Sequence, residues 1–200
     1  MSQQLAKVLS YLFHPVIYPV LGILIILNSV PYYIHSQATL LALIFVFTGT
    51  YIIPVLVSFL MLRLKIVASL EMKEAKDRRW PYLIGAISFY FTAAALNKIG
   101  LNNECYLFIQ ASAVVILLHF AMLRYWKPSA HLGSIGGFTG LLIALSLKYQ
   151  IGLLPIIALS ILAAGFLATA RLSLKAHTTG ELLFGYLSGL IMVGLFVYFL

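Results

Sequence analysis

Charged side chains are scarce in this chain of 200 residues, in which Asp, Glu, Lys and Arg together account for 9% of the sequence. Hydrophobic residues account for 62%, and the mean hydropathy is +1.04. Too little polar surface is left to cover a soluble globule, so a water-soluble domain is excluded. We therefore expect a single integral membrane domain over residues 1–200.

Acidic residues and cysteines are scarcer still. Five Asp and Glu residues stand against 13 Lys and Arg, which gives a formal net charge of +8. The cations lie in short segments between apolar runs, where anionic lipid headgroups and membrane topology explain them. We therefore expect the lipid bilayer, and no nucleic acid, as a partner. Cys105 is the only cysteine, which excludes an internal disulfide and a metal site built from several cysteines.

Long apolar runs are what the chain does contain. A helix needs about 20 apolar residues to cross roughly 30 Å of hydrocarbon, and such runs recur along the chain. The pattern predicts an all-α, polytopic transmembrane helical bundle with about seven transmembrane helices. We expect these spans at about residues 15–34, 38–62, 81–96, 105–123, 132–147, 153–170 and 182–200. The charged segment 63–80 is predicted to continue the second helix beyond the bilayer, and Pro81 to end or restart it.

The stretch 170–181 places three ionisable residues, Arg171, His177 and Glu181, between two long apolar runs. An ionised group at membrane depth costs about 2.5–3.5 kcal/mol even on the mildest scale, so such residues usually mark a wet cavity or a functional site. His177 and Glu181 lie four residues apart, so a helix opening here would bring the ring and the carboxylate together. An imidazole, its orienting carboxylate and a nearby cation favour chemistry on a phosphate; a buried pair that satisfies itself is the alternative.

A second polar motif occupies residues 128–131, Pro-Ser-Ala-His, at the start of the fifth expected span. A helix N-terminus attracts anions, and the Ser129 hydroxyl can add a donor, which suits a phosphate. An interfacial His131 and an ordinary N-cap at Ser129 explain the same residues equally well. The spacing of the glycines that follow favours close helix packing over a phosphate loop. These glycines are Gly133, Gly136, Gly137 and Gly140.

The number of crossings predicts that these motifs converge. Two expected spans separate the charged segment that ends at Pro81 from the segment 124–131, and two more separate that segment from residues 170–181. An even number of crossings returns the chain to the same face of the membrane. All three polar segments are therefore expected at one end of the bundle, where their cations can serve one site in addition to binding lipid headgroups.

Two of these segments together resemble the type 2 phosphatidic acid phosphatase superfamily of membrane lipid phosphate phosphatases. Residues 128–131 are similar to the family's Pro-Ser-Gly-His motif, and residues 170–181 are similar to Ser-Arg, five residues, His, three residues, Asp, with Ala170 and Glu181 as departures. The family's first motif is a lysine, six residues, then Arg-Pro. Lys73 and Arg79 correspond to it, with the lysine one position too close and Trp80 inserted before the proline.

The resemblance implies hydrolysis of a membrane lipid phosphate through a covalent phosphohistidine, without a cofactor or metal. His177 would attack phosphorus with Glu181 orienting it, and His131 would protonate the leaving group and later activate water. The implied phosphate-binding groups are Arg79, Lys73, Arg171, Ser129 and Ala130. We expect such a protein in a bacterial inner membrane.

Two alternatives remain open from the sequence. One is a non-catalytic membrane protein that keeps the anion pocket to bind or transport a phospholipid, which the departures from the family's patterns favour. The other is a metal-dependent membrane enzyme, since His131, His177 and Glu181 form a recognised catalytic zinc set. Arginines beside those ligands count against a dication.

Overall fold

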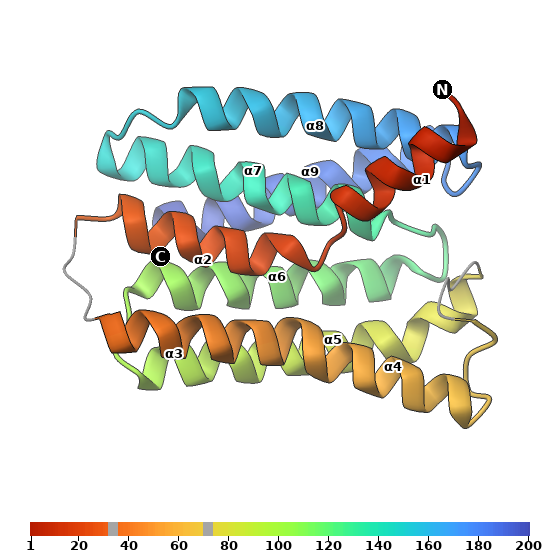
Figure 1. Ribbon diagram of the computed structural model, residues 1–200, viewed down its shortest axis with the longest axis horizontal. Helices are drawn as coiled ribbons and strands as arrows, with labels where there is room; N and C mark the ends of the chain where they lie inside the picture. Colours follow the sequence, from red (N-terminus) through yellow and green to blue (C-terminus); the bar gives the residue numbers. More distant parts are fainter. Residues whose placement is uncertain (32–35, 70–73) are drawn as a thin grey trace.

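The computed structural model describes residues 1–31, 36–69 and 74–200, and in these residues every regular element is a helix (Figure 1). The elements are α1 (Gln3–Leu12), α2 (Ile17–Ser29), α3 (Ser36–Phe47), the π-helical turn η1 (Thr48–Ile52), α4 (Ile53–Arg63), α5 (Ala75–Lys98), α6 (Asn103–Met122), α7 (Ala130–Tyr149), α8 (Leu154–Ser173) and α9 (Thr179–Phe199). The expected all-α bundle is confirmed.

Five helices of the described chain are long and apolar enough to cross a membrane. They are the continuous helix Gln37–Arg63 and the helices α6, α7, α8 and α9. The pair α1 and α2, bent by 45° at the break between them, makes a sixth if the two count as one span. Helix α5 is not among them, because charged residues in its first turns and Lys98 at its end lower its hydropathy.

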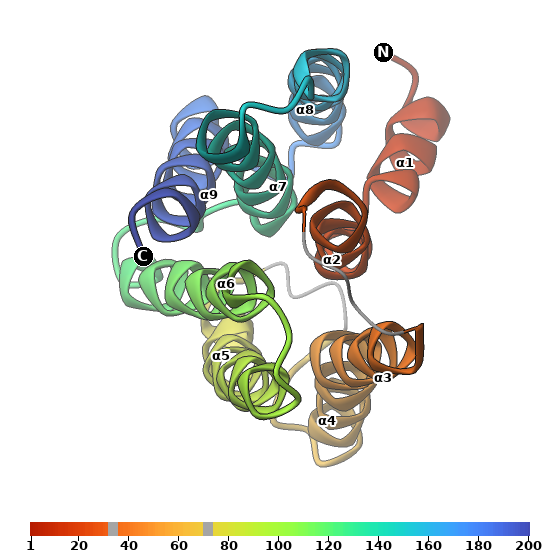
Figure 2. The same cartoon turned by 90° about the vertical axis from the view of Figure 1, so that its left-hand side faces the viewer.

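Seen end-on, the helices form two groups (Figure 2). Helices α7, α8 and α9 lie on one side, α3, α4 and α5 lie on the other, and α2 and α6 lie between them. The core residues are contributed mainly by α2, α6, α7 and α9, where side chains such as Ile23, Ile109, Leu141 and Leu145 are fully buried. The outward faces of α3, α4 and α8 carry exposed large apolar side chains, as a lipid-facing surface requires.

The first expected span differs from the observed one. Residues 15–34 were predicted as one helix, whereas α2 covers Ile17–Ser29 and a separate helix, α1, precedes it. Pro15 lies in the bend between the two, where a proline is accommodated because it has no N–H to donate. The predicted end of this span, at residues 32–34, lies outside the described residues.

The second expected span is confirmed, but its continuation is not. The helix ends at Arg63, and Lys65 takes a left-handed backbone conformation with φ of 59°, which closes the helix. A new helix, α5, begins at Ala75, and Pro81 lies inside it rather than at a boundary. The prediction that residues 63–80 extend the second helix and that Pro81 ends or restarts it is therefore wrong.

Glycines on α7 and α9 bring these two helices into the most extensive contact in the bundle. A Cβ atom added to Gly136 would overlap the carbonyl of Tyr186, and one added to Gly189 would overlap the carbonyl of Gly133. Only glycine permits backbones to approach this closely. The prediction that these glycines serve packing is confirmed. The close contact fixes the position of the start of α7 relative to the start of α9.

We expect Gly189→Ala to lower the melting temperature of the purified protein in detergent. The new methyl group must displace a backbone carbonyl, and such overpacking costs about 1–3 kcal/mol. Gly165→Ala on α8 is the matched control, because a Cβ there meets open space. Its melting temperature should be unchanged or slightly raised. Equal melting temperatures for the two variants would show that α7 and α9 do not need the glycine contact.

Candidate active site

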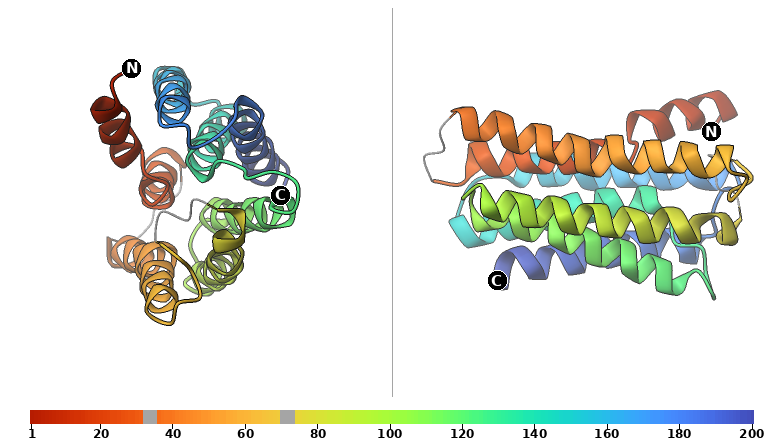
Figure 3. Two further views of the ribbon diagram at one scale, coloured as in Figure 1. Left: turned by 90° about the vertical axis from the view of Figure 1, so that its right-hand side faces the viewer. Right: turned by 90° about the horizontal axis from the view of Figure 1, so that it is seen from below.

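The polar segments meet at the end of the bundle where α7 and α9 begin and α8 ends, on the right in Figure 1. The convergence predicted from the even number of crossings is confirmed by hydrogen bonds that join residues about 50 positions apart. The same end includes the start of α5. Helix α1 also reaches it and lies beside α8 (Figure 3, left).

Residues 127–129, which lead into α7, hold the site together through their backbone. The N–H of Lys127 donates to Oε1 of Glu181 at 2.9 Å, and the N–H of Ser129 donates to the carbonyl of Glu181 at 3.2 Å. The carbonyl of Pro128 accepts from Nη1 of Arg78 at 3.3 Å. These bonds tie α5, α7 and α9 to one short segment.

His177 and Glu181 contact one another, but through a helix cap rather than along a helix face. Thr178 is the N-cap of α9, and its N–H donates to Oε2 of Glu181 at 2.9 Å in a capping box. Nδ1 of His177 lies 3.5 Å from the same Oε2 and 3.0 Å from the carbonyl of Lys127. A carbonyl can only accept, so Nδ1 carries the hydrogen. In the neutral ring, Nε2 therefore keeps its lone pair.

Cations surround His177. Its side chain is 1% exposed, and burial lowers the pKa of the imidazole well below the usual range of a histidine. Arg78, Arg171 and Lys127 lower that pKa further, and the Glu181 carboxylate partly opposes them. Burial and the neighbouring Arg78 also lower the pKa of Lys127. His177 is thus held as a neutral imidazole beside three basic groups, a combination that favours an anionic ligand and a nucleophilic nitrogen.

This arrangement predicts that protein stability depends on pH through His177. The unfolded chain binds a proton at the ordinary histidine pKa of about 6.5. The folded chain resists that proton, so the unfolded state binds more protons below this pH and is favoured as the pH falls. Stability linked to His177 should be present in full above about pH 6.5 and be lost progressively below it.

Thermal unfolding in detergent, from about pH 8 down to about pH 5, measures this effect. The comparison is with His177→Asn, whose amide can still donate to the Lys127 carbonyl but does not titrate. We expect the wild-type melting temperature to fall more steeply with decreasing pH than that of the variant. Parallel curves would show that His177 titrates normally.

His131 is held by α1. Its Nε2 lies 3.2 Å from the carbonyl of Ser10, which must accept, so this nitrogen carries a hydrogen. The ring also packs edge-on against His14 in the α1–α2 bend, with centroids 5.5 Å apart. Nη1 of Arg171 lies 3.4 Å from the hydroxyl of the same Ser10. Ser10 therefore links His131 to Arg171. It lies outside the polar motifs, so it was not identified from the sequence as a site residue.

The predicted phosphate ligands Ser129 and Ala130 open helix α7. The Ser129 hydroxyl accepts from the N–H of Leu132 at 3.4 Å, as an N-cap does, and the residue is fully buried. Ala130 is partly exposed and lines a cavity between α5, α6 and α7. The N-cap alternative for Ser129 thus has direct structural support.

The basic residue that α5 contributes is Arg78 rather than Arg79. Arg78 is 8% exposed, whereas the side chain of Arg79 is exposed. Helical phase explains the difference, because residue 78 shares the inward face with Tyr82 and Gly85, at spacings of four and seven. The helical phase of α5 could have identified Arg78 from the sequence. Lys73 lies outside the described residues.

Metal binding by the site residues finds no support in the geometry. Across residues 1–31, 36–69 and 74–200, no group of three or more His, Cys, Asp or Glu side chains is placed to hold a metal ion. His131, His177 and Glu181 therefore do not converge as a zinc set would. Both oxygens of Glu181 already accept backbone N–H groups.

Comparisons of the chain with protein-family models, with curated proteins and with solved structures find no match. The function is therefore inferred from the chemistry and geometry of the residues themselves.

Proposed function

We propose that the protein is a membrane-embedded phosphatase that hydrolyses a lipid phosphate or diphosphate through a phosphohistidine on His177. The observation that carries this proposal is the state of the His177 ring. Its Nδ1–H is held by the Lys127 carbonyl at 3.0 Å and lies 3.5 Å from the Glu181 carboxylate. The neutral ring then presents the Nε2 lone pair, which is what attack on phosphorus requires.

The surrounding charges supply what phosphoryl transfer needs most, which is positioning and charge stabilisation. Among the described residues, three cations, Arg78, Lys127 and Arg171, and one carboxylate, Glu181, act on His177. The Nε of Arg171 is buried and finds no hydrogen-bond partner among the described residues. A buried donor of this kind is costly unless a ligand satisfies it, and a phosphate oxygen would do so.

In the first step, Nε2 of His177 forms a bond to phosphorus as the bond from phosphorus to the lipid oxygen breaks. In its doubly protonated form, His131 gives one proton to the departing oxygen and becomes neutral. Glu181 stabilises the positive charge that develops on the His177 ring. The arginines balance the charge on the equatorial oxygens.

In the second step, a water molecule attacks the phosphohistidine. Neutral His131 accepts a proton from this water as its oxygen bonds to phosphorus, and the bond between phosphorus and Nε2 breaks. Inorganic phosphate leaves, and both histidines return to their starting protonation states. No metal takes part in either step.

The substrate is proposed to be a lipid because the site lies at the end of an apolar bundle. Helix α5 would complete seven crossings, since residues 81–98 run alongside α6 for much of its length. Arg78 would then lie where the membrane meets water, at the depth of a lipid phosphate. A bacterial inner membrane stays a prediction that cell fractionation would check.

A second candidate function is non-catalytic binding or transport of a phospholipid. The contact that favours it is the one between Nε2 of His131 and the Ser10 carbonyl, because a general acid must be able to offer its proton to substrate. If α1 stays in place, His131 serves only to hold this helix. The anion pocket would then bind a headgroup without cleaving it.

Phosphate release by the purified protein separates these functions. The substrates are phosphatidate, phosphatidylglycerophosphate and a polyprenyl diphosphate, each with and without a chelator. The phosphatase predicts release from at least one of them, unaffected by the chelator. Saturable binding without release would support the second candidate, and release that the chelator abolishes would support the metal-dependent alternative.

A further inference from the structure

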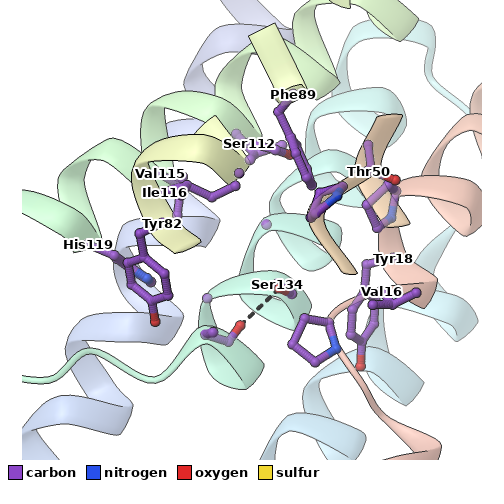
Figure 4. Close-up of a pocket in the computed structure, with 18 of the residues that line it drawn as sticks. Val16, Tyr18, Thr50, Tyr82, Phe89, Ser112, Val115, Ile116, His119 and Ser134 are labelled. Carbon is purple, nitrogen blue, oxygen red and sulfur yellow. Dashed lines mark hydrogen bonds between the residues drawn. The ribbon is translucent and has the colours of Figure 1, made fainter. Parts of the chain in front are cut away.

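A partly open cavity of about 210 Å³ lies between α2, η1, α4, α5, α6, α7 and α9 (Figure 4). Its walls are mainly apolar, with Phe89, Phe108, Val115, Ile116 and Val193 among them. An apolar cavity of roughly 150 Å³ in another protein binds benzene, so a space of this size is able to hold a hydrocarbon.

The cavity lining extends along α5 from Pro81 to Phe89, which is about 12 Å, and along α7 from Ala130 to Gly137, which is about 10 Å. At Ala130 it borders the candidate active site. Ala130 lies directly after the Ser129 N-cap, and the Tyr82 hydroxyl accepts from Nη1 of Arg78 at 3.4 Å. A ligand with its phosphate among the arginines could therefore extend its tail into this space.

Two features of the cavity lining suit a ligand. Tyr18, 4% exposed, lines the cavity, and its hydroxyl is buried without a hydrogen-bond partner among the described residues. Figure 4 shows the rings of Tyr18 and Tyr82 on either side of Ser134. Gly85, on the α5 wall, would carry a Cβ that meets nothing within 4 Å. The α5 wall is thus open where a side chain would otherwise fill the space.

We propose that this cavity binds one hydrocarbon chain of a lipid phosphate, and that the Tyr18 hydroxyl donates to an oxygen near the start of that chain. The assignment rests on the proposed function for the position of the phosphate, but chain binding itself needs no turnover. Pockets for drug-sized ligands measure about 300–1,000 Å³. A space of about 210 Å³ therefore takes a single chain, and a second chain of a two-chain lipid would stay in the bilayer.

Photo-crosslinking tests this site directly. The probe is dodecyl phosphate with a diazirine at the chain end, added to the full-length protein in lipid nanodiscs and mapped by mass spectrometry. We expect the label on the inward faces of α5 and α6, between Tyr82 and Phe89 or between Phe108 and Val115. Labels confined to the lipid-facing residues of α3, α4 and α8 would overturn the proposal.

Gly85→Leu fills the cavity and should lower labelling of α5 and α6 by about tenfold or more, since exclusion of two methylene groups alone has that effect on affinity. Gly165→Leu is the matched control, because Gly165 is a helical glycine with open space around it that does not line the cavity. It should label as the wild type does. Equal labelling of Gly85→Leu and wild type would contradict the proposal. The map of the wild type remains decisive if Gly85→Leu does not fold.

The source of the chain is identified by competition. Unlabelled farnesyl phosphate and oleoyl lysophosphatidate carry a prenyl chain and an acyl chain, and the better competitor shows which the cavity prefers. Competition by neither would overturn the proposal. His177→Ala separates it from the phosphatase: labelling that persists in this variant, with or without turnover in the wild type, supports the chain site independently of the chemistry.

Discussion

Replacement of His177 by alanine should abolish phosphate release, with a loss of at least about a thousandfold in kcat. The variant has no nitrogen to attack phosphorus, and water alone would have to do so in the remaining anion pocket. His131→Ala should be less severe, with a loss of roughly a hundredfold or more, since it removes only general acid and base assistance. Initial rates at saturating substrate, for variants whose melting temperatures match the wild type, measure both effects.

The two histidines make the comparison informative, because both lie at the same end of the bundle. His177 is tied to the Lys127 carbonyl and His131 to the Ser10 carbonyl, so each removal costs one comparable hydrogen bond. If both histidines had merely structural roles, the two variants would therefore show similar, modest losses in kcat. Full activity in His177→Ala would end the proposed mechanism.

The second large effect on activity is expected from Arg78, with the adjacent Arg79 as its control. Arg78→Ala should lower kcat/KM by on the order of a hundredfold to a thousandfold, because it removes a buried cation that stabilises charge developing on the phosphate. Arg79→Ala should change kcat/KM by less than about twofold, since an exposed charge contributes little. The two variants differ by one position in the same helix and carry the same change in composition.

Arg78→Lys adds a control for charge alone. It keeps the positive charge but loses the guanidinium Nη1 that reaches the Pro128 carbonyl and the Tyr82 hydroxyl, so partial recovery is expected. Kinetics on the preferred lipid phosphate, with melting temperatures alongside, measure the series. A larger loss in Arg79→Ala than in Arg78→Ala would show that the alignment to the family's first motif is right and that the helical phase of α5 is misleading.

Much of the architecture could be predicted from the sequence, because a bilayer restricts a chain to few solutions. Apolar runs with few charges must form helices that satisfy their own backbone, and the number of runs between polar segments determines which ends meet. Both arguments depend on coarse composition, so they survive errors of a few residues in helix bounds. The glycines of α7 were predictable for a similar reason, since small residues at helical spacing permit close contact in lipid.

Details that depend on local geometry were not predictable in the same way. The helix that ends at Arg63 is terminated by a left-handed backbone conformation at Lys65. Nothing in the sequence indicates that conformation at this residue. The contact of His177 with Glu181 was expected from a spacing of four along a helix, yet it arises from the capping box at Thr178. Ser10 carries no motif at all. It reaches His131 and Arg171 only because the α1–α2 bend turns α1 against α8.

The covalent intermediate provides the most direct test of the central claim. A preferred lipid phosphate, labelled on phosphorus and mixed with the wild-type protein, should leave the label on the chain when the reaction is stopped rapidly under alkaline conditions, in which a phosphohistidine survives. Peptide mapping should place it on His177. Turnover with no label on His177, or a label on any other residue, would contradict the account.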